Sequence, residues 1–217
     1  LKFMTDQEKQ AMIEACDAKV GDSIFIIADP YDECHKIIGA LRTEIATKLD
    51  LIEKDIYKFC WIVDFPMFEL DKETGKIDFS HNPFSMPQGG LEALKTKQPL
   101  DVLAYQYDIV VNGIELSSGA VRNHDPEIMT EAFKIAGYTE QELQVKFGAL
   151  YTAFKFGAPP HAGIAPGVDR MIMLLLDEPS IREIIAFPMN KKAQDLMMGA
   201  PGYVTEKQLR EVHIKIR

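Results

Sequence analysis

The dipeptide Asn112-Gly113 constrains the fold of this 217-residue chain more than any other part of its sequence. It separates two runs that are rich in apolar and β-branched residues, and Asn-Gly in that setting favours a two-residue type I′ turn. The sequence therefore predicts an antiparallel hairpin over residues 107–119. Helices are predicted on both sides of this hairpin, so we expect an α+β fold in which helices flank an antiparallel sheet.

The register of the hairpin decides which side chains can act together. With a two-residue turn, Val110 lies opposite Glu115 and Asp108 lies opposite Ser117, and opposed residues share a face. Asp108 and Glu115 then become diagonal neighbours with Cβ atoms roughly 7 Å apart. Two carboxylates at that separation can share a divalent cation, and Mg²⁺ takes one or two carboxylates together with substrate phosphates. The alternative is a hairpin face on which both acids simply meet solvent.

Arg122 lies two residues beyond Ala120, just after the small residues of the hairpin. A guanidinium beside small residues suits a carboxylate that is bound by two parallel hydrogen bonds. A surface ion pair with Asp125 or Glu127 is the alternative, and such pairs contribute little to stability. The local sequence leaves both interpretations open.

Three small residues alternate along a strand that is predicted at 162–167: Gly163, Ala165 and Gly167. Their alternation leaves one face of the strand bare, so a flat ring could lie against it. Arg170 follows in the first turn of the next predicted helix, where a cation opposes the helix dipole and needs a compensating partner. A nucleotide phosphate, a stacked adenine or the neighbouring Asp169 could supply that partner.

The chain is expected to divide into a small first part, residues 1–55, and a larger second part, residues 56–217. In the first part, residues 23–28 predict a buried strand, and apolar residues between 34 and 49 recur at helical spacing. One strand and two helices cannot close a core, so this part should complete a domain that begins upstream. In the second part, residues 87–99 contain Gly, Pro and Lys and predict a surface loop.

The composition excludes several classes of protein. The formal net charge of −9 argues against a chain that grips a nucleic-acid backbone by itself. No apolar run reaches the roughly 18 residues that span a bilayer, and the polar first residues do not form a signal peptide, so no membrane partner is expected. Three widely spaced cysteines suit reduced thiols, which predicts a cytoplasmic location. The chain begins with Leu1 instead of Met, which suggests a fragment.

Five segments of the chain together resemble the class II aminoacyl-tRNA synthetases, and specifically the bacterial aspartyl type. They are CWIVDFPMFE (60–69), SHNPFSMP (80–87), YDIVVNGIELSSGAVRNHD (107–125), KFGALYTAFKFGAPPHAGIAPGVDR (146–170) and IREIIAFP (181–188). They occur in the order that is typical of the family, and five linked segments are far more specific than one motif. Residues 1–55 are similar to the end of the insertion domain of the bacterial enzymes, and residues 56–217 are similar to the C-terminal part of the catalytic domain.

The resemblance implies a role for each matching residue. The residues implied to bind ATP are Glu115, Gly167, Val168, Asp169 and Arg170. Of these, Glu115 and Arg170 are implied to be catalytic, and Glu115 is implied to hold Mg²⁺ together with Asp108. His81 and Arg122 are implied to bind the aspartate substrate. The chain departs from many members of the family at Asn82, at Ser117-Ser118-Gly119-Ala120 and at Asn123-His124, which looks like a subgroup variant.

The resemblance also implies an activity for the full-length protein. Such an enzyme activates aspartate with ATP to aspartyl-adenylate, transfers the aspartyl group to tRNA, and is expected to be a cytoplasmic homodimer. The anticodon-binding domain, the first class motif and the arginine of the second class motif do not occur in this chain, so we expect the chain alone to be inactive. Two alternatives are a tRNA-independent paralogue that uses the same fold and a non-catalytic binding module.

Overall fold

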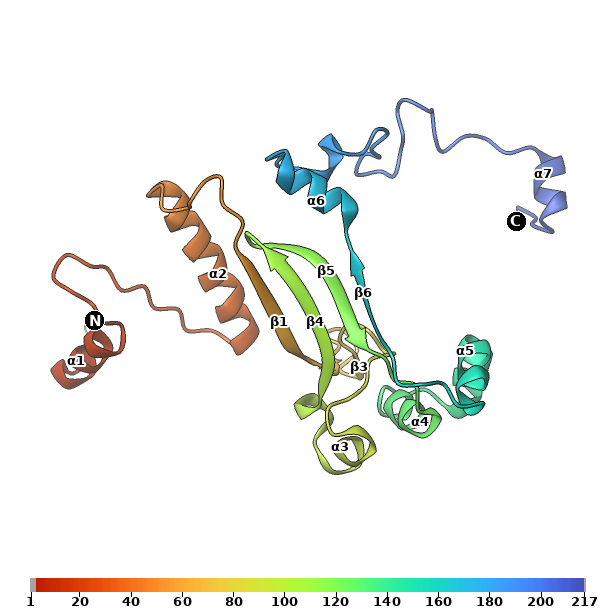
Figure 1. The fold of residues 1–217 in the computed structure, drawn as a ribbon, viewed down its shortest axis with the longest axis horizontal. Helices are drawn as coiled ribbons and strands as arrows, with labels where there is room; N and C mark the ends of the chain where they lie inside the picture. The colour runs from red at the N-terminus through yellow and green to blue at the C-terminus, as the bar shows by residue number, and fades with distance from the viewer. Residues whose placement is uncertain (1–2, 217) are drawn as a thin grey trace. The chain divides into compact units, whose positions relative to one another are not determined.

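The structure is a computed structural model that describes residues 3–216. The chain divides into two compact units between Ile56 and Tyr57. We call the part up to Ile56 unit 1 and the part from Tyr57 unit 2 (Figure 1). None of the helices in the described part of the chain combines the length and the apolarity that are needed to cross a membrane.

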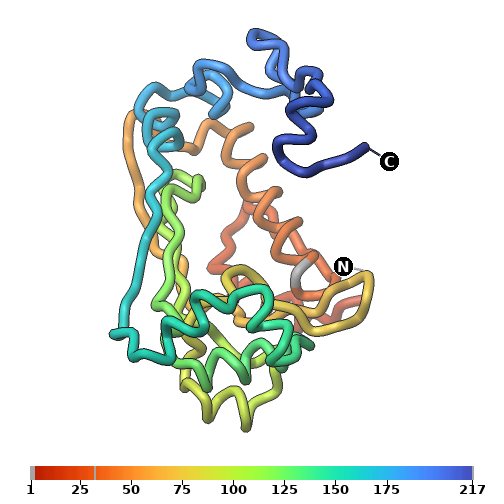
Figure 2. Tube along the Cα trace, turned by 90° about the vertical axis from the view of Figure 1, so that its right-hand side faces the viewer, coloured from red at the N-terminus to blue at the C-terminus, as the bar shows by residue number. Residues whose placement is uncertain are grey.

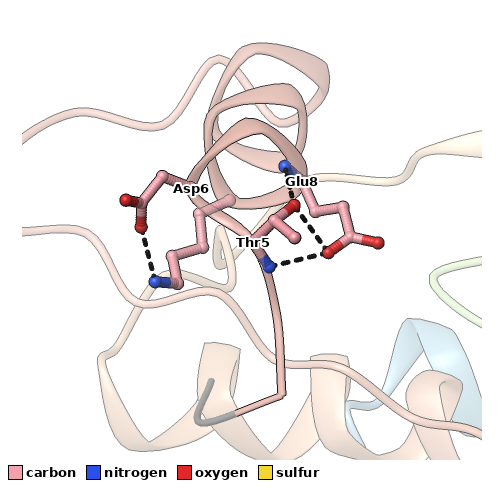
Figure 3. A network of polar contacts seen from close by, with 4 residues as sticks. Thr5, Asp6 and Glu8 are labelled. Carbon is pink, nitrogen blue, oxygen red and sulfur yellow. Dashed lines mark hydrogen bonds and ion pairs between the residues drawn. The ribbon is translucent and has the colours of Figure 1, made fainter.

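Unit 1 contains two helices, α1 (Asp6–Ala15) and α2 (Tyr31–Lys48). A capping box begins α1: the Thr5 hydroxyl accepts the N–H of Glu8 at 3.2 Å, and the Glu8 carboxylate accepts the N–H of Thr5 at 2.7 Å (Figure 3). The backbone N–H and the hydroxyl of Thr5 both donate to this carboxylate, and they hold the pKa of Glu8 below its usual value. The helix that the sequence predicts between residues 34 and 49 is confirmed as α2.

The prediction of a buried strand at residues 23–28 is wrong. These residues adopt no strand, and the side chains of Phe25 and Ile26 are 55% and 59% exposed. An extended segment becomes a strand only when a neighbouring strand forms backbone hydrogen bonds with it. The described residues of unit 1 contain no strand that could pair with residues 23–28. None of the described side chains of unit 1 is buried. The expected small α+β part is therefore two helices joined by an extended segment.

Unit 2 is built on a four-stranded antiparallel sheet with the order β1-β4-β5-β6. Its strands are β1 (Phe59–Pro66), β4 (Leu103–Val111), β5 (Ile114–Val121) and β6 (Ala162–Pro166). A second sheet pairs β2 (Phe68–Leu70) with β3 (Ile77–Phe79). The predicted hairpin is confirmed as β4–β5, and the φ angles of Asn112 and Gly113, 49° and 81°, are the positive values that a type I′ turn requires.

Helices lie at both ends of the main sheet (Figure 1). They are α3 (Gly90–Thr96), α4 (Pro126–Ile135) and α5 (Glu140–Lys155) at one end and α6 (Val168–Leu175) at the other, with 3₁₀ turns η1 (Pro99–Asp101) and η2 (Ile181–Glu183). Helix α7 (Glu206–Glu211) follows near the end of the chain, away from the sheet. The trace in Figure 2 leaves α5 at one end of the sheet and follows β6 to α6 at the other end. Asp125 caps the start of α4, and Thr139 caps the start of α5 with a capping box. The α+β class with an antiparallel sheet and flanking helices is thus confirmed.

Two apolar clusters hold the α3–α5 end of unit 2 together. The first core cluster consists of Met67, Phe68, Leu94, Val102, Ala104 and Ala132, and the second consists of Met129, Phe133, Leu143 and Tyr151. Helix α4 contributes to both clusters, so it joins them. The surface loop that the sequence predicts at residues 87–99 is instead largely the helix α3, because Leu94 belongs to the first cluster and anchors a helix there.

Candidate functional site

Strand register places two acidic residues on one face of the main sheet. Asp108 on β4 lies opposite Ser118 on β5, and Val110 on β4 lies opposite Glu115. Opposed residues share a face, and so do residues two apart on one strand, so Asp108 and Glu115 share a face. We call it the site face. The pairing of Val110 with Glu115 confirms the register that the Asn-Gly turn predicts.

A β-bulge corrects the rest of the predicted register. Asp108 does not lie opposite Ser117, because β5 contains an extra residue, Leu116, where β4 has none. The carbonyl oxygen of Leu116 accepts the N–H of Gly167 at 2.8 Å, which ties the bulge to the start of α6. Ser117 consequently lies opposite Ile109 and belongs to the other face of the sheet.

The same end of β5 holds Arg170. The guanidinium Nη1 of Arg170 donates to the Glu115 carboxylate at 3.1 Å and also to the Glu115 carbonyl oxygen. Glu115 is therefore the compensating partner that the first turn of α6 needs, in place of Asp169. Both side chains are close to half exposed, so this pair positions the two groups more than it stabilises the fold. Gly167 is the N-cap of α6, and Val168 and Asp169 are exposed residues of its first turn.

Arg122 lies just beyond β5, on the site face. Its guanidinium rests over Gly163 of β6, because a Cβ built on that glycine would lie 3.3 Å from Nη2. Gly163 lies opposite Ala120, which is two residues from Arg122 on the same chain segment. The face of β6 that the sequence predicts to be bare is therefore in contact with the Arg122 side chain.

Neither alternative partner predicted for Arg122 binds it. The Asp125 carboxylate accepts the N–H groups of Glu127 and Ile128 and caps α4. The Glu127 carboxylate lies 3.5 Å from Lys95 Nζ. Within the described part of the chain, the half-buried guanidinium of Arg122 has no hydrogen-bond or ion-pair partner, so its donors remain available to a ligand.

A short segment before α3 brings His81 to the site face. The N–H of Met86 donates to Val121 of β5 at 2.8 Å, and the Met86 carbonyl accepts the N–H of Tyr105 of β4 at 2.9 Å, so this segment fills the gap where β4 and β5 separate. Upstream of it, the side chain of Gln106 donates to the Asn82 carbonyl at 3.4 Å. Gln106 is two residues from Asp108 and shares its face, so the loop with His81 lies beside that face.

His81 itself is exposed and makes one aromatic contact. Its ring packs edge-on against Phe65 of β1, with 5.2 Å between the ring centroids. The neighbouring Asn82, not His81, fixes the loop, because its side-chain oxygen accepts the N–H of Phe84 at 3.0 Å. Among the described residues, the His81 ring has this aromatic contact and no hydrogen-bond partner.

The residues that the sequence singles out lie along or beside the site face: Glu115 with its partner Arg170 at one end of β5, Asp108 on β4, and Arg122 and the loop with His81 toward the other end. Two acids suit an Mg²⁺ ion that takes its remaining ligands from phosphates and water, and they do not suit a site enclosed by protein. Residues 3–216 contain no group of three or more His, Cys, Asp or Glu side chains that could hold a metal.

Sequence reasoning missed two polar residues near this face. Gln106 is 7% exposed and Ser85 is fully buried. Gln106 could have been found from its alternation with Asp108 along β4. Ser85 could not, because its position depends on a pairing between the segment before α3 and the end of β5.

Comparison with known proteins identifies relatives of the whole chain. A model of the family described as tRNA synthetases class II (D, K and N) matches residues 4–191. An aspartate–tRNA ligase from Streptomyces avermitilis is 58% identical over 216 residues, which cover 100% of this chain and 37% of that protein. An aspartate–tRNA(Asp/Asn) ligase from Gluconobacter oxydans is also 58% identical over 216 residues, and the chain covers 36% of it. The chain therefore spans little more than a third of the length of these relatives.

Among solved structures, an aspartyl tRNA synthetase from Entamoeba histolytica is similar to the chain. It has a TM-score of 0.47 and 26% sequence identity, and the match covers 88% of this chain and 32% of that one.

Proposed function

The chain belongs to the class II tRNA synthetases (D, K and N), and from this premise we propose that it is part of an aspartate–tRNA ligase. The observation that carries the proposal is the site face, where two carboxylates and two guanidiniums lie around one strand, β5. Opposite charges in this arrangement suit a substrate that carries both a carboxylate and a polyphosphate. The names of the two relatives at 58% identity both contain aspartate and tRNA, which supports aspartate as the carboxylate substrate.

Arg122 binds the side-chain carboxylate of aspartate in this proposal. Its guanidinium has no partner among the described residues, and it can donate two parallel hydrogen bonds to a carboxylate. A substrate without that carboxylate would leave the guanidinium half-buried and unpaired, which is costly, so Arg122 selects for aspartate. His81, on the loop beside the same face, lies on the amino-acid side of the site.

Glu115 and Arg170 act on the nucleotide, with Gly167, Val168 and Asp169 beside it at the start of α6. Asp108 and Glu115 would hold Mg²⁺, which when bound neutralises charge on the phosphates of ATP. The ion pair between Glu115 and Arg170 keeps the carboxylate and the guanidinium at one position before any ligand arrives. The chain's contribution to the chemistry is thus orientation and charge complementarity.

The full-length enzyme would join the α-carboxylate of aspartate to the α-phosphate of ATP, release pyrophosphate and pass the aspartyl group to tRNA. Because the chain covers 37% of its relative, tRNA contacts would come mainly from other parts of the full-length protein. The net charge of −9 agrees with this division. The proposal includes a homodimer that works in the cytoplasm, where ATP and tRNA are available.

A titration with a non-hydrolysable aspartyl-adenylate analogue tests this function. We expect the chain to bind the analogue and Arg122→Ala to weaken binding at least tenfold, because the substrate carboxylate loses its charged partner. Ser117→Ala is the matched control, since Ser117 belongs to the opposite face of the same strand and should leave binding unchanged. An analogue that binds neither protein, or both equally, would refute the proposal.

A further inference from the structure

Ser85 is a buried polar residue to which the proposed function gives no role. It is 0% exposed, and its hydroxyl has no hydrogen-bond partner among the described residues. A buried hydroxyl without a partner is unfavourable and needs an explanation. Its full burial also means that no ligand on the surface can reach it directly.

The backbone places Ser85 directly opposite Arg122. Two hydrogen bonds flank this pair: the N–H of Met86 donates to Val121 at 2.8 Å, and the N–H of Asn123 donates to Phe84 at 2.7 Å. A pair between two such bonds is of the non-hydrogen-bonded type, in which opposed side chains lie closest and on one face. Arg122 is therefore the residue whose side chain leaves the backbone directly opposite Ser85, on the same face.

These two side chains are chemically complementary, and neither has a polar partner within the described residues. The guanidinium has five N–H donors, of which a bidentate carboxylate takes two, and the serine oxygen is an acceptor. In the structure the guanidinium leans to the other side, over Gly163. A rotation of this side chain away from Gly163 and toward the segment that contains Ser85 would bring its remaining donors toward the serine hydroxyl.

We propose that Ser85 is a positioning residue for Arg122. When a carboxylate occupies the site, the Ser85 hydroxyl accepts an N–H of Arg122 and fixes the plane in which the guanidinium meets the carboxylate. The inference deepens the proposed function and rests on it, since it assumes that Arg122 binds aspartate. Ser85 touches no substrate atom itself.

Ser117 provides a matched control for this role. Its hydroxyl is also buried and also lacks a hydrogen-bond partner among the described residues. It lies opposite Ile109 and Pro166, whose side chains offer no donor, and it faces away from the site. Ser85→Ala and Ser117→Ala therefore remove the same atom from equally buried positions, and only one of these positions adjoins Arg122.

A double-mutant cycle tests the inference. The ¹⁵N-labelled chain is titrated with L-aspartate by NMR, as wild type, Ser85→Ala, Arg122→Lys, the double variant and Ser117→Ala. We expect Ser85→Ala to weaken binding about three- to tenfold in the wild type and less than twofold in Arg122→Lys, because lysine has no planar fork to fix. Ser117→Ala should change binding less than twofold.

The Arg122 Nε–H resonance gives a second measurement. In the wild type, saturating L-aspartate should slow its exchange with water, and in Ser85→Ala this protection should be lost. The inference is overturned if Ser85→Ala binds like the wild type, if it weakens binding equally in both backgrounds, or if Ser117→Ala weakens binding as much. A wild type that binds no L-aspartate, or an Arg122→Lys variant that binds it equally well, would overturn the proposed function and this inference with it.

Discussion

Helices α2 of unit 1 and α4 of unit 2 are both amphipathic, yet they meet very different surroundings. On α2, the apolar side chains of Ile37 and Ile38 are 44% and 48% exposed. On α4, Met129 and Phe133 are 0% and 2% exposed, and the ring of Phe133 packs against that of Phe79 at 4.8 Å between centroids. The apolar stripe of a helix thus determines which face can be buried, and only a partner surface determines whether it is buried.

The difference between the units lies in what covers each element. Unit 2 encloses two apolar clusters around α4, and those clusters fix the end of the sheet from which the His81 loop and the segment with Ser85 extend. Unit 1 buries none of its described side chains, so its helices depend on capping and on local contacts. The stability of the site should therefore follow substitutions in unit 2 and be insensitive to those in unit 1.

The largest expected effect comes from Phe133→Ala. This change removes a buried ring from the second core cluster and should lower the free energy of unfolding of unit 2 by about 3–5 kcal/mol. Ile38→Ala is the counterpart in unit 1. It should change the free energy of unfolding of unit 2 by less than about 0.5 kcal/mol, because the side chain is half exposed. Urea unfolding followed by the fluorescence of Trp61, the single tryptophan of the chain, measures unit 2 selectively. Equal losses of unfolding free energy in both variants would contradict the difference described between the two units.

Alanine substitutions at two glycines, one in each unit, should change stability in opposite directions. A Cβ on Gly119 would fall on the ring of Tyr107 and 2.5 Å from the carbonyl oxygen of Gly163, so Gly119→Ala should destabilise unit 2 by about 1–3 kcal/mol. A Cβ on Gly39 in α2 would meet nothing within 4 Å, and Gly39→Ala should stabilise that helix by up to about 1 kcal/mol. Trp61 fluorescence reports the first change and far-UV circular dichroism reports the second. A stabilising Gly119→Ala would contradict the packing described for β5.

Features that depend on neighbouring residues could be predicted from the sequence. The Asn112-Gly113 turn and the register of the first hairpin pairs form as predicted, and the caps at Thr5, Asp125 and Thr139 lie at residue types that favour helix starts. Each is set by the backbone conformation or by hydrogen bonds within a few residues. The candidate site residues are named from motifs of the resemblance, and their roles stay a prediction.

Features that depend on distant partners could not be predicted. The bulge at Leu116 is fixed by a hydrogen bond from Gly167, and the partner of Arg170 is Glu115, so both depend on how β5 meets α6. Residues 23–28 have the composition of a strand but no strand beside them among the described residues. The helix α3 was missed because Leu94 gains its stability from a cluster that the local sequence does not reveal.

A smaller effect is expected from the helix caps. Thr139 begins α5, which buries Leu143 and Tyr151, so Thr139→Ala should lower the free energy of unfolding of unit 2 by about 1 kcal/mol. Thr5 makes the same capping box at the start of α1, where no residue is buried. Thr5→Ala should reduce the helicity measured by circular dichroism and leave the Trp61 transition in place. A shift of that transition in Thr5→Ala would show that the units are coupled.

The smallest effect concerns pH. The backbone N–H of Thr139, then its hydroxyl, hold the pKa of Glu142 below the ordinary value of 4.5. Because the folded state has the lower pKa, the carboxylate stabilises unit 2 above the unfolded value, and this contribution is lost as pH falls through the folded pKa.

Glu142→Gln isolates this contribution, since glutamine can keep the capping box without a charge. We expect the wild type to unfold at a slightly higher urea concentration than Glu142→Gln near pH 7, and the difference should shrink as the pH falls below 4.5 and through the lowered pKa of the folded state. Glu8→Gln removes the equivalent carboxylate from unit 1 and should leave the Trp61 transition unchanged at every pH, because the cap of α1 supports no buried residue. If the difference in urea midpoint between wild type and Glu142→Gln grows on acidification, its sign is opposite to that expected for a lowered pKa. The capping box would then not be the cause of the difference.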